Sequence, residues 1–275
     1  MHKILHGDCL DVLRTMPDDS VDLVIGSPPY SDARTYGIGF SLKGQDWVDW
    51  AFERYMECVR VSRGAVCWVV GGRTRKYRWD ATPTLLMADL HRAGVNLRNP
   101  LLYKRHGIPG SGGPDWFANK YEWIICSTPA GRLPWSDNTA MGHEPKYKPG
   151  GPQSHWTKGP AGYSGGDVRV KAAVYKPPAL ANPGNIIDCG VVGGGHMGSP
   201  LSAENEAPFP EQIPEFLIRS LCPPNGTVLD PFSGSGTTAK VAKVHGRGSI
   251  SIDLRESQVE LTQRRLGEAD DARTQ

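Results

Sequence analysis

Apolar and polar residues form strand-like and helix-like patterns in turn through the first half of the chain. Apolar runs at 21–25 and 65–70, each stopped by glycine or proline, predict buried strands. Between them, residues 46–60 place apolar side chains at the spacing of one helix face. Shorter patterns predict helices at 9–16 and 83–94 and strands at 99–104 and 121–127.

The pattern fades after residue 127 and resumes near residue 209. From there the sequence predicts helix 211–221, strand 227–229, helix 237–245, strand 249–253 and a helix that ends near residue 266. Alternation of this kind is typical of an α/β fold with a doubly wound, mostly parallel sheet. We therefore predict one domain made of residues 1–127 and 205–266, with an insert at 128–204 and a flexible tail at 267–275.

Composition marks the insert as loop-rich and basic. Residues 101–200 hold 18 glycines and 12 prolines, a density that long helices do not tolerate. The same window has a net charge of +4 in a chain whose total is +2. Loop-rich segments on a rigid scaffold commonly carry binding surfaces, so the insert is a candidate for recognition of a partner.

Several classes of protein are disfavoured by the sequence. It has no run of apolar residues long enough to span a membrane and no signal-peptide pattern, which predicts a cytoplasmic protein. Six cysteines without a CxxC pair predict neither a disulfide framework nor a cysteine zinc site. His196 lies among glycines without a second ligand at metal-binding spacing, so we predict no metal.

The segment DPFSGSGTT at 230–238 lies between a predicted strand and a predicted helix. Gly234 and Gly236 permit a tight turn and keep side chains away from an approaching ligand. Asp230 ends its strand, and Asp253 ends the next strand 23 residues later. An acid at that second position is well placed to accept the hydroxyls of a ribose.

This segment leaves several interpretations. A phosphate loop needs a lysine before its Ser/Thr, whereas Gly236 is followed directly by Thr237, so an NTPase is disfavoured. A dinucleotide site needs GxGxxG, and GSGTTA offers only an alanine at the third place. A nucleoside cofactor without a pyrophosphate fits better, because Asp230 would attract its positively charged end. A glycine-rich turn that binds nothing is the remaining alternative.

A second motif, SPPY at 27–30, directly follows a predicted buried strand. Its two prolines fix φ and lack N–H groups, so the loop is stiff and presents acceptors rather than donors. Ser27 Oγ and the Pro28 carbonyl are suited to accept both hydrogens of an exocyclic amine, which makes its lone pair available. Pro29 stiffens the loop, and Tyr30 offers a ring on which a base stacks. Taken alone, a proline-rich turn without function is an equal alternative.

Together the two motifs resemble those of the DNA amino-methyltransferases that use S-adenosylmethionine. SPPY is similar to their catalytic [DNS]PP[YFW] motif, and DPFSGSGTT is similar to their cofactor motif. The catalytic motif precedes the cofactor motif, with a variable region between them, which is the order of the beta group. The resemblance covers roughly residues 4–127 and 205–266 and implies a Rossmann-like methyltransferase fold.

Further segments extend the resemblance. GDCLDVL at 7–13 resembles a family segment that places Asp8 near the cofactor adenine, and APFPE at 207–211 resembles one whose Phe packs on the cofactor. Two departures are Asn205-Glu206 in place of His-Pro and Asp253 in place of a common Glu. The resemblance and the turn chemistry together predict ten cofactor-binding residues: Asp8, Phe209, Glu211, Asp230, Phe232, Ser233, Gly234, Gly236, Thr237 and Asp253.

Double-stranded DNA is the partner that the resemblance implies. Basic and aromatic residues on loops suit contacts with phosphates and bases, although any single one of them is equally an ordinary surface residue. The predicted DNA contacts are Tyr103, Lys104, Lys146, Lys148, Trp156 and Lys158. A second basic cluster (Arg73, Arg75, Lys76, Arg78) either contacts phosphates or begins a solvated helix.

The predicted reaction is methylation of an exocyclic amine of a flipped base in a specific DNA sequence. Serine at the first motif position resembles the cytosine-N4 members of the family, so that base is favoured over adenine N6. A relative that binds DNA without turnover is a further alternative. Cys222 is interpreted as structural. A cognate restriction endonuclease is an optional partner, and a monomer and a homodimer are both compatible with the sequence.

Overall fold

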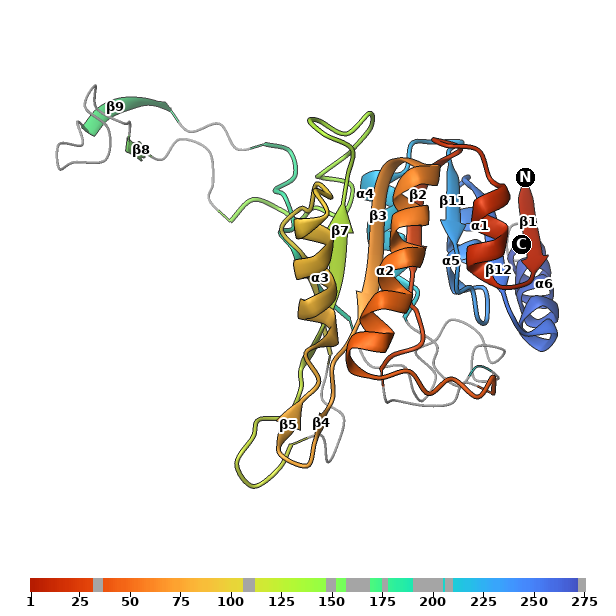
Figure 1. The fold of residues 1–275 in the computed structure, drawn as a ribbon. Coiled ribbons are helices and arrows are strands. Elements are labelled where there is room, and N and C mark those ends of the chain that lie inside the picture. The colour runs from red at the N-terminus through yellow and green to blue at the C-terminus, as the bar shows by residue number, and fades with distance from the viewer. Residues whose placement is uncertain are drawn as a thin grey trace. The chain divides into compact units, whose positions relative to one another are not determined.

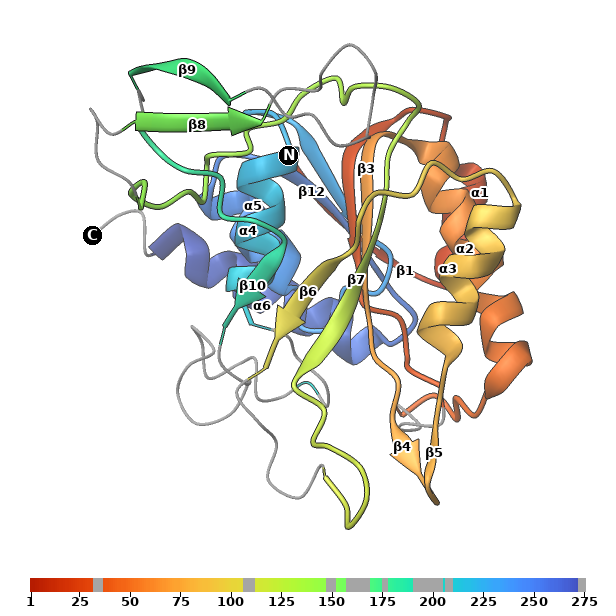
Figure 2. The ribbon, with the colours of Figure 1, turned by 90° about the vertical axis from the view of Figure 1, so that its left-hand side faces the viewer.

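The computed structural model describes residues 1–31, 37–105, 112–146, 152–156, 169–174, 178–189, 205 and 210–271. Eight strands form one sheet (Figures 1 and 2): β1 (His2–His6), β2 (Val21–Gly26), β3 (Ser62–Val70), β6 (Leu101–Lys104), β7 (Tyr121–Ser127), β10 (Ile186–Asp188), β11 (Thr227–Asp230) and β12 (Gly248–Asp253). Their order across the sheet is β1-β12-β11-β2-β3-β7-β6-β10.

Every pair of neighbouring strands is parallel except the two pairs that β7 makes, with β3 and with β6. The sheet is therefore mostly parallel, with β7 the one reversed strand among these eight. β2 and β11 are direct neighbours at its centre, with Leu23 opposite Val228 and Val24 opposite Leu229. Both strands are buried along nearly their whole length, as expected for strands covered on both faces.

Helices cover both faces of the sheet (Figure 2). On one face lie α1 (Cys9–Thr15), α2 (Gly44–Val61) and α3 (Thr82–Arg92). On the other lie α4 (Gln212–Leu221), α5 (Thr237–Val244) and α6 (Glu256–Asp271). Successive residues of β2 alternate between the two apolar cores, because Val24 packs with the first set of helices and Leu23 and Ile25 pack with the second. The doubly wound α/β prediction is confirmed.

A second compact unit comprises residues 138–184, and residues 1–137 with 185–275 form the first. The second unit contains the antiparallel strands β8 (Pro152–Trp156) and β9 (Arg169–Val174). Strand β10 follows the second unit in the chain and belongs to the main sheet of the first unit. The predicted insert at 128–204 includes this strand. The boundaries and recognition role assigned to that insert stay predictions.

The structure differs from the sequence-based expectations at four places. Strands β1 and β10 were not expected. β1 contains only a short apolar run, and β10 is only three residues long in a proline-rich stretch. The basic cluster after β3 forms a hairpin, β4 (Thr74–Arg75) and β5 (Arg78–Trp79), and not the start of a helix. The last helix runs to Asp271 and so includes the first five residues of the predicted tail. Helices tolerate a glycine such as Gly267 at a cost of about 1 kcal/mol.

Within the described ranges, no helix is both long and apolar enough to span a membrane. All six cysteines are buried and unpaired by disulfides. No group of three His, Cys, Asp or Glu side chains in the described residues is arranged to hold a metal ion. His196 lies outside those residues.

Candidate active site

The two sequence motifs meet at one edge of the sheet. Because β2 and β11 are parallel neighbours, the loop that begins at Ser27 and the turn that begins after Asp230 leave the same edge side by side. A Cβ atom on Gly26 would lie 3.4 Å from Cδ2 of Phe232, so the two segments touch. Residues about two hundred positions apart in the chain therefore form one site.

Aromatic rings hold the contact between these two segments. The ring of Phe232 lies 5.2 Å from that of Trp68 on β3 and 5.9 Å from that of Trp50 on α2, measured between centroids. Trp47, one turn earlier on α2, donates its indole N–H to the Pro29 carbonyl oxygen at 2.7 Å. The stiff proline loop is thus fixed from α2, and Pro28 is buried beneath it.

Tyr30 is held in place by a residue of the reversed strand. Its hydroxyl donates to Glu122 Oε2 at 2.7 Å, and Glu122 also pairs with Arg105. Gly71, at the end of β3, packs against both side chains, since a Cβ there would lie 3.1 Å from the Tyr30 ring and 3.3 Å from Glu122 Cγ. The orientation of the Tyr30 ring is therefore set by β7 and β3 as well as by its own loop.

The glycine-rich turn has the left-handed backbone that the sequence indicates. Gly234 and Gly236 have φ of 48° and 75°, which favours glycine. A Cβ on Gly236 would lie 2.7 Å from Thr262 of α6, and one on Gly234 would lie 2.7 Å from the side-chain nitrogen of Asn205. Asn205, one of the two departures from the family pattern, therefore lies directly against the turn.

A buried arginine braces this turn from α6. Arg265 has no exposed surface and donates to the Ser235 carbonyl and hydroxyl and to the Thr237 hydroxyl. The same guanidinium pairs with Glu211 at 2.9 Å, and Lys240 pairs with Glu211 at 3.0 Å. Glu211 is predicted to bind the cofactor, and in the structure it joins the start of α4 to α5 and α6. We propose that it acts through Arg265 on the shape of the turn.

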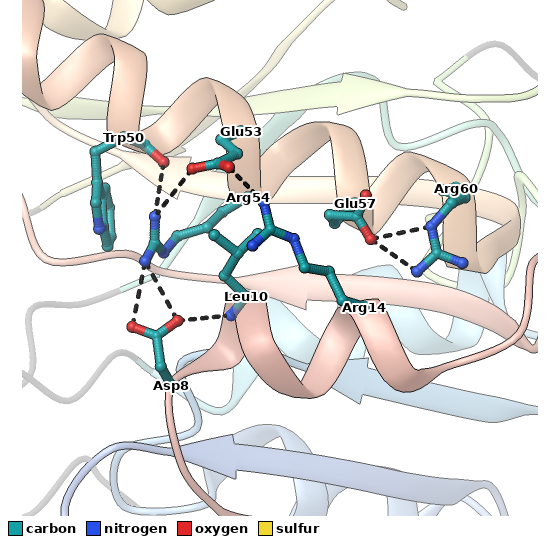
Figure 3. Close-up of polar contacts among 8 residues, drawn as sticks. All are labelled: Asp8, Leu10, Arg14, Trp50, Glu53, Arg54, Glu57 and Arg60. Carbon is teal, nitrogen blue, oxygen red and sulfur yellow. Dashed lines mark hydrogen bonds and ion pairs between the residues drawn. The ribbon is translucent and has the colours of Figure 1, made fainter.

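Three aspartates lie at the ends of neighbouring strands, and two of them have cationic partners. Asp253 accepts from the backbone N–H of Gly234 at 2.8 Å and from that of Arg255 at 2.9 Å, and its carboxylate lies 3.5 Å from Arg255 Nε. Asp8 follows β1, caps α1 by accepting from the Leu10 N–H, and faces Arg54 (Figure 3). Asp253 therefore lies against the turn, and Asp8 is two residues beyond His6, which pairs with Asp253 across β1 and β12.

Arg54 approaches Asp8 from α2 and is almost fully buried. One guanidinium nitrogen lies 3.2 Å from each carboxylate oxygen of Asp8, and the guanidinium lies 4.5 Å from the centre of the Trp50 ring. Figure 3 shows Arg54 between Trp50 and Asp8, while the neighbouring Arg14 points to Glu53. Arg54 therefore links the Phe232 aromatic group to the predicted adenine end of the site.

Asp230 differs from the other two because it is buried without a cation. Its side chain is 1% exposed, and its donors in the described residues are the Phe232 N–H and the Thr238 hydroxyl, both neutral groups. Burial raises the pKa of this carboxyl from 3.8 to about 7, the hydrogen bonds oppose that rise, and the charge of Asp253 adds to it. A buried carboxylate of this kind is characteristic of a binding site for a positive group.

The residues present fit S-adenosylmethionine, which the resemblance implies. Its sulfonium and ammonium groups are cationic, and Asp230 is an acid that lacks a cationic partner among the described residues. The hydroxyls of Ser233 and Ser251 are buried at the turn and on β12 without a hydrogen-bond partner in the described part of the chain. Asp8 and Asp253 supply acceptors for hydroxyl and amino groups. These residues are therefore the ones that would hold the cofactor.

The predicted DNA contacts are not all placed in one surface. Tyr103 is 4% exposed and packs in the core beside Ile124 and Ile187, so little of its surface is available to a partner, and its contact with DNA stays a prediction. Lys104 is exposed and pairs with Asp188 at 2.6 Å. Lys146 is exposed in the second unit. Three predicted DNA contacts lie outside the described residues: Lys148, Lys158 and the side chain of Trp156. The predicted cofactor residue Phe209 also lies outside them.

Sequence reasoning missed residues that support the site from behind. Arg54 occupies the buried face of α2, between Ala51 and Cys58, and a charge on an apolar stripe was the signal that could have found it. Glu122 interrupts the apolar run of β7 in the same way. Arg265 gave no such signal, because its helix is polar on average and its partner Glu211 is 54 positions away.

Asp230→Asn should make the cofactor-free protein more stable at neutral and alkaline pH. A carboxyl whose folded pKa is about 7 and whose ordinary value is 3.8 costs stability progressively as pH rises from about 4 to about 7. The amide removes that cost, so Tm at pH 8 should rise by roughly 5 °C, with no difference near pH 4. Thermal melts from pH 4 to 8.5 test this, with the exposed Asp49→Asn as control; an equal Tm difference at every pH contradicts it.

Arg54→Met should weaken cofactor binding with little effect on the fold. Methionine keeps the apolar stem of the arginine, and Asp8 remains 38% exposed and hydrated when its partner is lost. Without Arg54, Asp8 loses its fixed orientation, and we expect the Kd of S-adenosylmethionine to rise about tenfold.

Calorimetric titration and a thermal melt measure the two effects of that change separately. Arg14→Met is the matched control, because Arg14 pairs with Glu53 and not with Asp8. Equal Kd values for Arg54→Met and the unaltered chain would remove the proposed role of Arg54.

Comparison with known proteins agrees with this geometry. A family model described as DNA methylase matches residues 21–264. The chain is 28% identical to the Type II methyltransferase M.BglII of Bacillus subtilis over 98% of its own length and 71% of that protein. It is 27% identical to the DNA adenine methyltransferase YhdJ of Escherichia coli over 96% of its length and 82% of that protein.

Solved structures share the fold. The PvuII DNA methyltransferase (cytosine-N4-specific) superposes with a TM-score of 0.69 at 20% identity, covering 98% of this chain and 89% of that one. A putative DNA modification methylase of Thermus thermophilus, solved in complex with S-adenosyl-L-methionine, gives 0.60 at 21% identity, with 98% and 96% covered. The family match over most of the chain and the meeting of its two motifs lead to one conclusion: this chain belongs to the N6/N4 DNA methylase family.

Proposed function

We propose that this DNA methyltransferase moves a methyl group from S-adenosylmethionine to the exocyclic amine of a base flipped out of duplex DNA, with cytosine N4 the favoured target. The observation that carries the proposal is that Gly26, the residue before the Ser27 loop, lies against the Phe232 ring, where an added Cβ atom would be 3.4 Å from Cδ2. The Ser27 loop, which carries acceptors for an amine, therefore leaves the sheet beside Asp230. Of the three strand-end aspartates Asp8, Asp230 and Asp253, only Asp230 has no cationic partner among the described residues.

The Ser27 loop is suited to hold and activate the amine. Ser27 Oγ and the Pro28 carbonyl accept its two hydrogens, which draws the nitrogen toward a tetrahedral geometry and frees its lone pair. Trp47 occupies the next carbonyl, that of Pro29, and so fixes the loop rather than the base. Tyr30, oriented by Glu122, stacks on the flipped base. Positioning of this kind supplies much of the acceleration of a displacement reaction.

The turn after β11 is suited to hold the cationic cofactor. When bound, S-adenosylmethionine supplies an electrophilic methyl group on a positively charged sulfur. Asp230 attracts that charge, and its own pKa of about 7 falls as a cation approaches, so binding strengthens as pH rises through 7. Asp253 and Asp8 orient the nucleoside part, and Phe232 excludes water between the two loops.

Methylation at carbon 5 of cytosine is disfavoured because it needs a cysteine thiolate. Burial raises the pKa of Cys222 to about 12, and its side chain is fully buried behind α4. Burial also raises the pKa of the Cys9 thiol and that of the Cys189 thiol to about 12. Amine methylation needs no such nucleophile, since the amine itself attacks.

Adenine N6 is the second candidate target. Serine at the first position of the SPPY motif favours cytosine, and the PvuII enzyme that shares the fold is cytosine-N4-specific by name. One of the relatives in sequence is a DNA adenine methyltransferase by name. The sequence leaves the oligomeric state open between monomer and homodimer, and a partner nuclease stays optional.

The modified nucleoside should be N4-methylcytosine. Purified protein, S-adenosylmethionine and plasmid DNA from a methylation-deficient host are incubated, and the DNA is digested to nucleosides for mass measurement. N6-methyladenine instead would overturn the preference for cytosine. Absence of any methylated nucleoside, with cofactor binding intact, would overturn the proposed transfer and favour a DNA-binding relative.

Ser27→Ala should lower turnover far more than cofactor affinity. The hydroxyl acts on the amine in the transition state, so its loss should reduce kcat about 100-fold. The Kd of S-adenosylmethionine should change less than twofold, because Ser27 belongs to the other loop. Single-turnover methylation and calorimetry measure the two quantities, with Ser31→Ala, a buried serine of the same loop, as the matched control. Equal losses in both quantities for Ser27→Ala would argue against the proposed role.

A further inference from the structure

The β4–β5 hairpin leaves the sheet at the edge that carries the candidate site. Thr74 pairs with Trp79 and Arg75 with Arg78, so the connecting loop has only two residues, Lys76 and Tyr77. Their φ angles are 47° and 64°. Two positive φ angles in a two-residue loop define a type I′ turn, which strongly favours Asn-Gly. This chain has a long cation and a large aromatic residue there instead.

The turn therefore holds two side chains in a conformation that such residues rarely adopt. Strain of this kind persists where a function needs those side chains. Tyr77 is 71% exposed, a large fraction for a tyrosine. Its ring rests against the edge of Trp116 with 5.3 Å between centroids and planes 88° apart, so the ring is supported by the segment before β7.

The surroundings of Tyr77 are strongly basic. The segment 72–80 contains Arg73, Arg75, Lys76 and Arg78 against the single acid Asp80. A cationic hairpin with an exposed aromatic tip is suited to a polyanion that has flat, stackable groups. Duplex DNA is the polyanion that the family identity already supplies as substrate.

The hairpin is rooted on the catalytic loop. Gly71, the residue before it, would place a Cβ atom 3.1 Å from the Tyr30 ring. An extended chain advances about 3.3 Å per residue, so the hairpin tip lies within roughly 17 Å of that contact. Figures 1 and 2 both show β4–β5 projecting from the edge at which β3 ends. That reach spans about five steps of a DNA strand.

We propose that Tyr77 is a wedge that enters the duplex beside the target base and fills the space that the flipped base leaves. The basic side chains on either side of it bind the flanking phosphates. Side chains that part base steps and stack on the exposed bases act in this way in other DNA-distorting proteins. The inference rests on the proposed function, because it concerns how the target base reaches the Ser27 loop.

Tyr77→Gly tests the wedge without disturbing the fold, because glycine is favoured at a φ of 64°. Tyr77→Phe keeps the ring and is the matched control. Two duplexes carry a site mapped with the unaltered protein, one with a normal partner opposite the target base and one with an abasic position there. Single-turnover methylation rates are measured on both.

We expect Tyr77→Gly to lose about 10- to 100-fold in rate on the paired duplex and less than threefold on the abasic duplex, where the target base is already unpaired. Tyr77→Phe should behave as the unaltered protein on both. Equal losses on the two duplexes, or no loss on either, would overturn the wedge. If the unaltered protein methylates neither duplex, the proposed function fails, and the binding measurement below decides whether the hairpin contacts DNA.

Binding to a 30-bp duplex isolates the phosphate contacts. The variant K76Q/R78Q should weaken binding and lower the slope of log Kd against log salt by about 1 to 2, whereas Arg92→Gln, an exposed arginine on α3, should not. An unchanged slope of log Kd against log salt would overturn the DNA role of the hairpin. The basic hairpin would then be a candidate to contact another kind of partner, such as a protein.

Discussion

The parallel pairing of β2 with β11 is the constraint on which the candidate site depends. Each strand ends in a loop with its own chemistry, and the two loops are about two hundred residues apart in the chain. Parallel neighbours deliver their carboxyl ends to one edge, so the contact between Gly26 and Phe232 follows from the register of the central strands. Burial of these strands on both faces makes that register hard to shift without loss of the core.

Charge is distributed unequally across this edge. Asp8 is paired with Arg54, and Asp253 accepts from the backbone N–H of Gly234 in the glycine-rich turn and lies 3.5 Å from Arg255 Nε. Only Asp230 of the three is buried among neutral partners, with a pKa near 7. Folding therefore carries an electrostatic cost at this position, and a cationic ligand removes it. A ligand that binds only the folded state also stabilises that state by mass action.

Much of the sheet could be predicted from the sequence because its strands are continuous apolar runs with clear stops. The turn at Gly234 and Gly236 could also be predicted, since two glycines after a strand fix the local geometry. The pairings of the supporting residues could not be predicted. Glu122 is recognisable as an acid within an apolar strand, but its contact with Tyr30 joins distant segments, as does the contact of Arg265 with Glu211. A single sequence gives no register for such contacts.

The burial of Tyr103 could not be predicted for the same reason. The strand β10 pairs with β6 beside Tyr103, and it is too short to be recognised in a proline-rich sequence. The charge of the basic segment after β3 suggests phosphate contacts, which stay a prediction, but it does not indicate a shape. Its positive φ angles occur at Lys76 and Tyr77, residues that do not favour the turn they form.

The reversal of β7 has a consequence for how such an enzyme can diversify. Because β7 runs against its neighbours, its first residues, and not its last, lie at the catalytic edge, and Glu122 reaches Tyr30 from there. The connection from β6 to β7 therefore leaves and re-enters the sheet at the edge of the candidate site. Insertions in that connection would remodel the rim around the target base while every strand keeps its place, which gives evolution and engineers a site for new specificity outside the second unit.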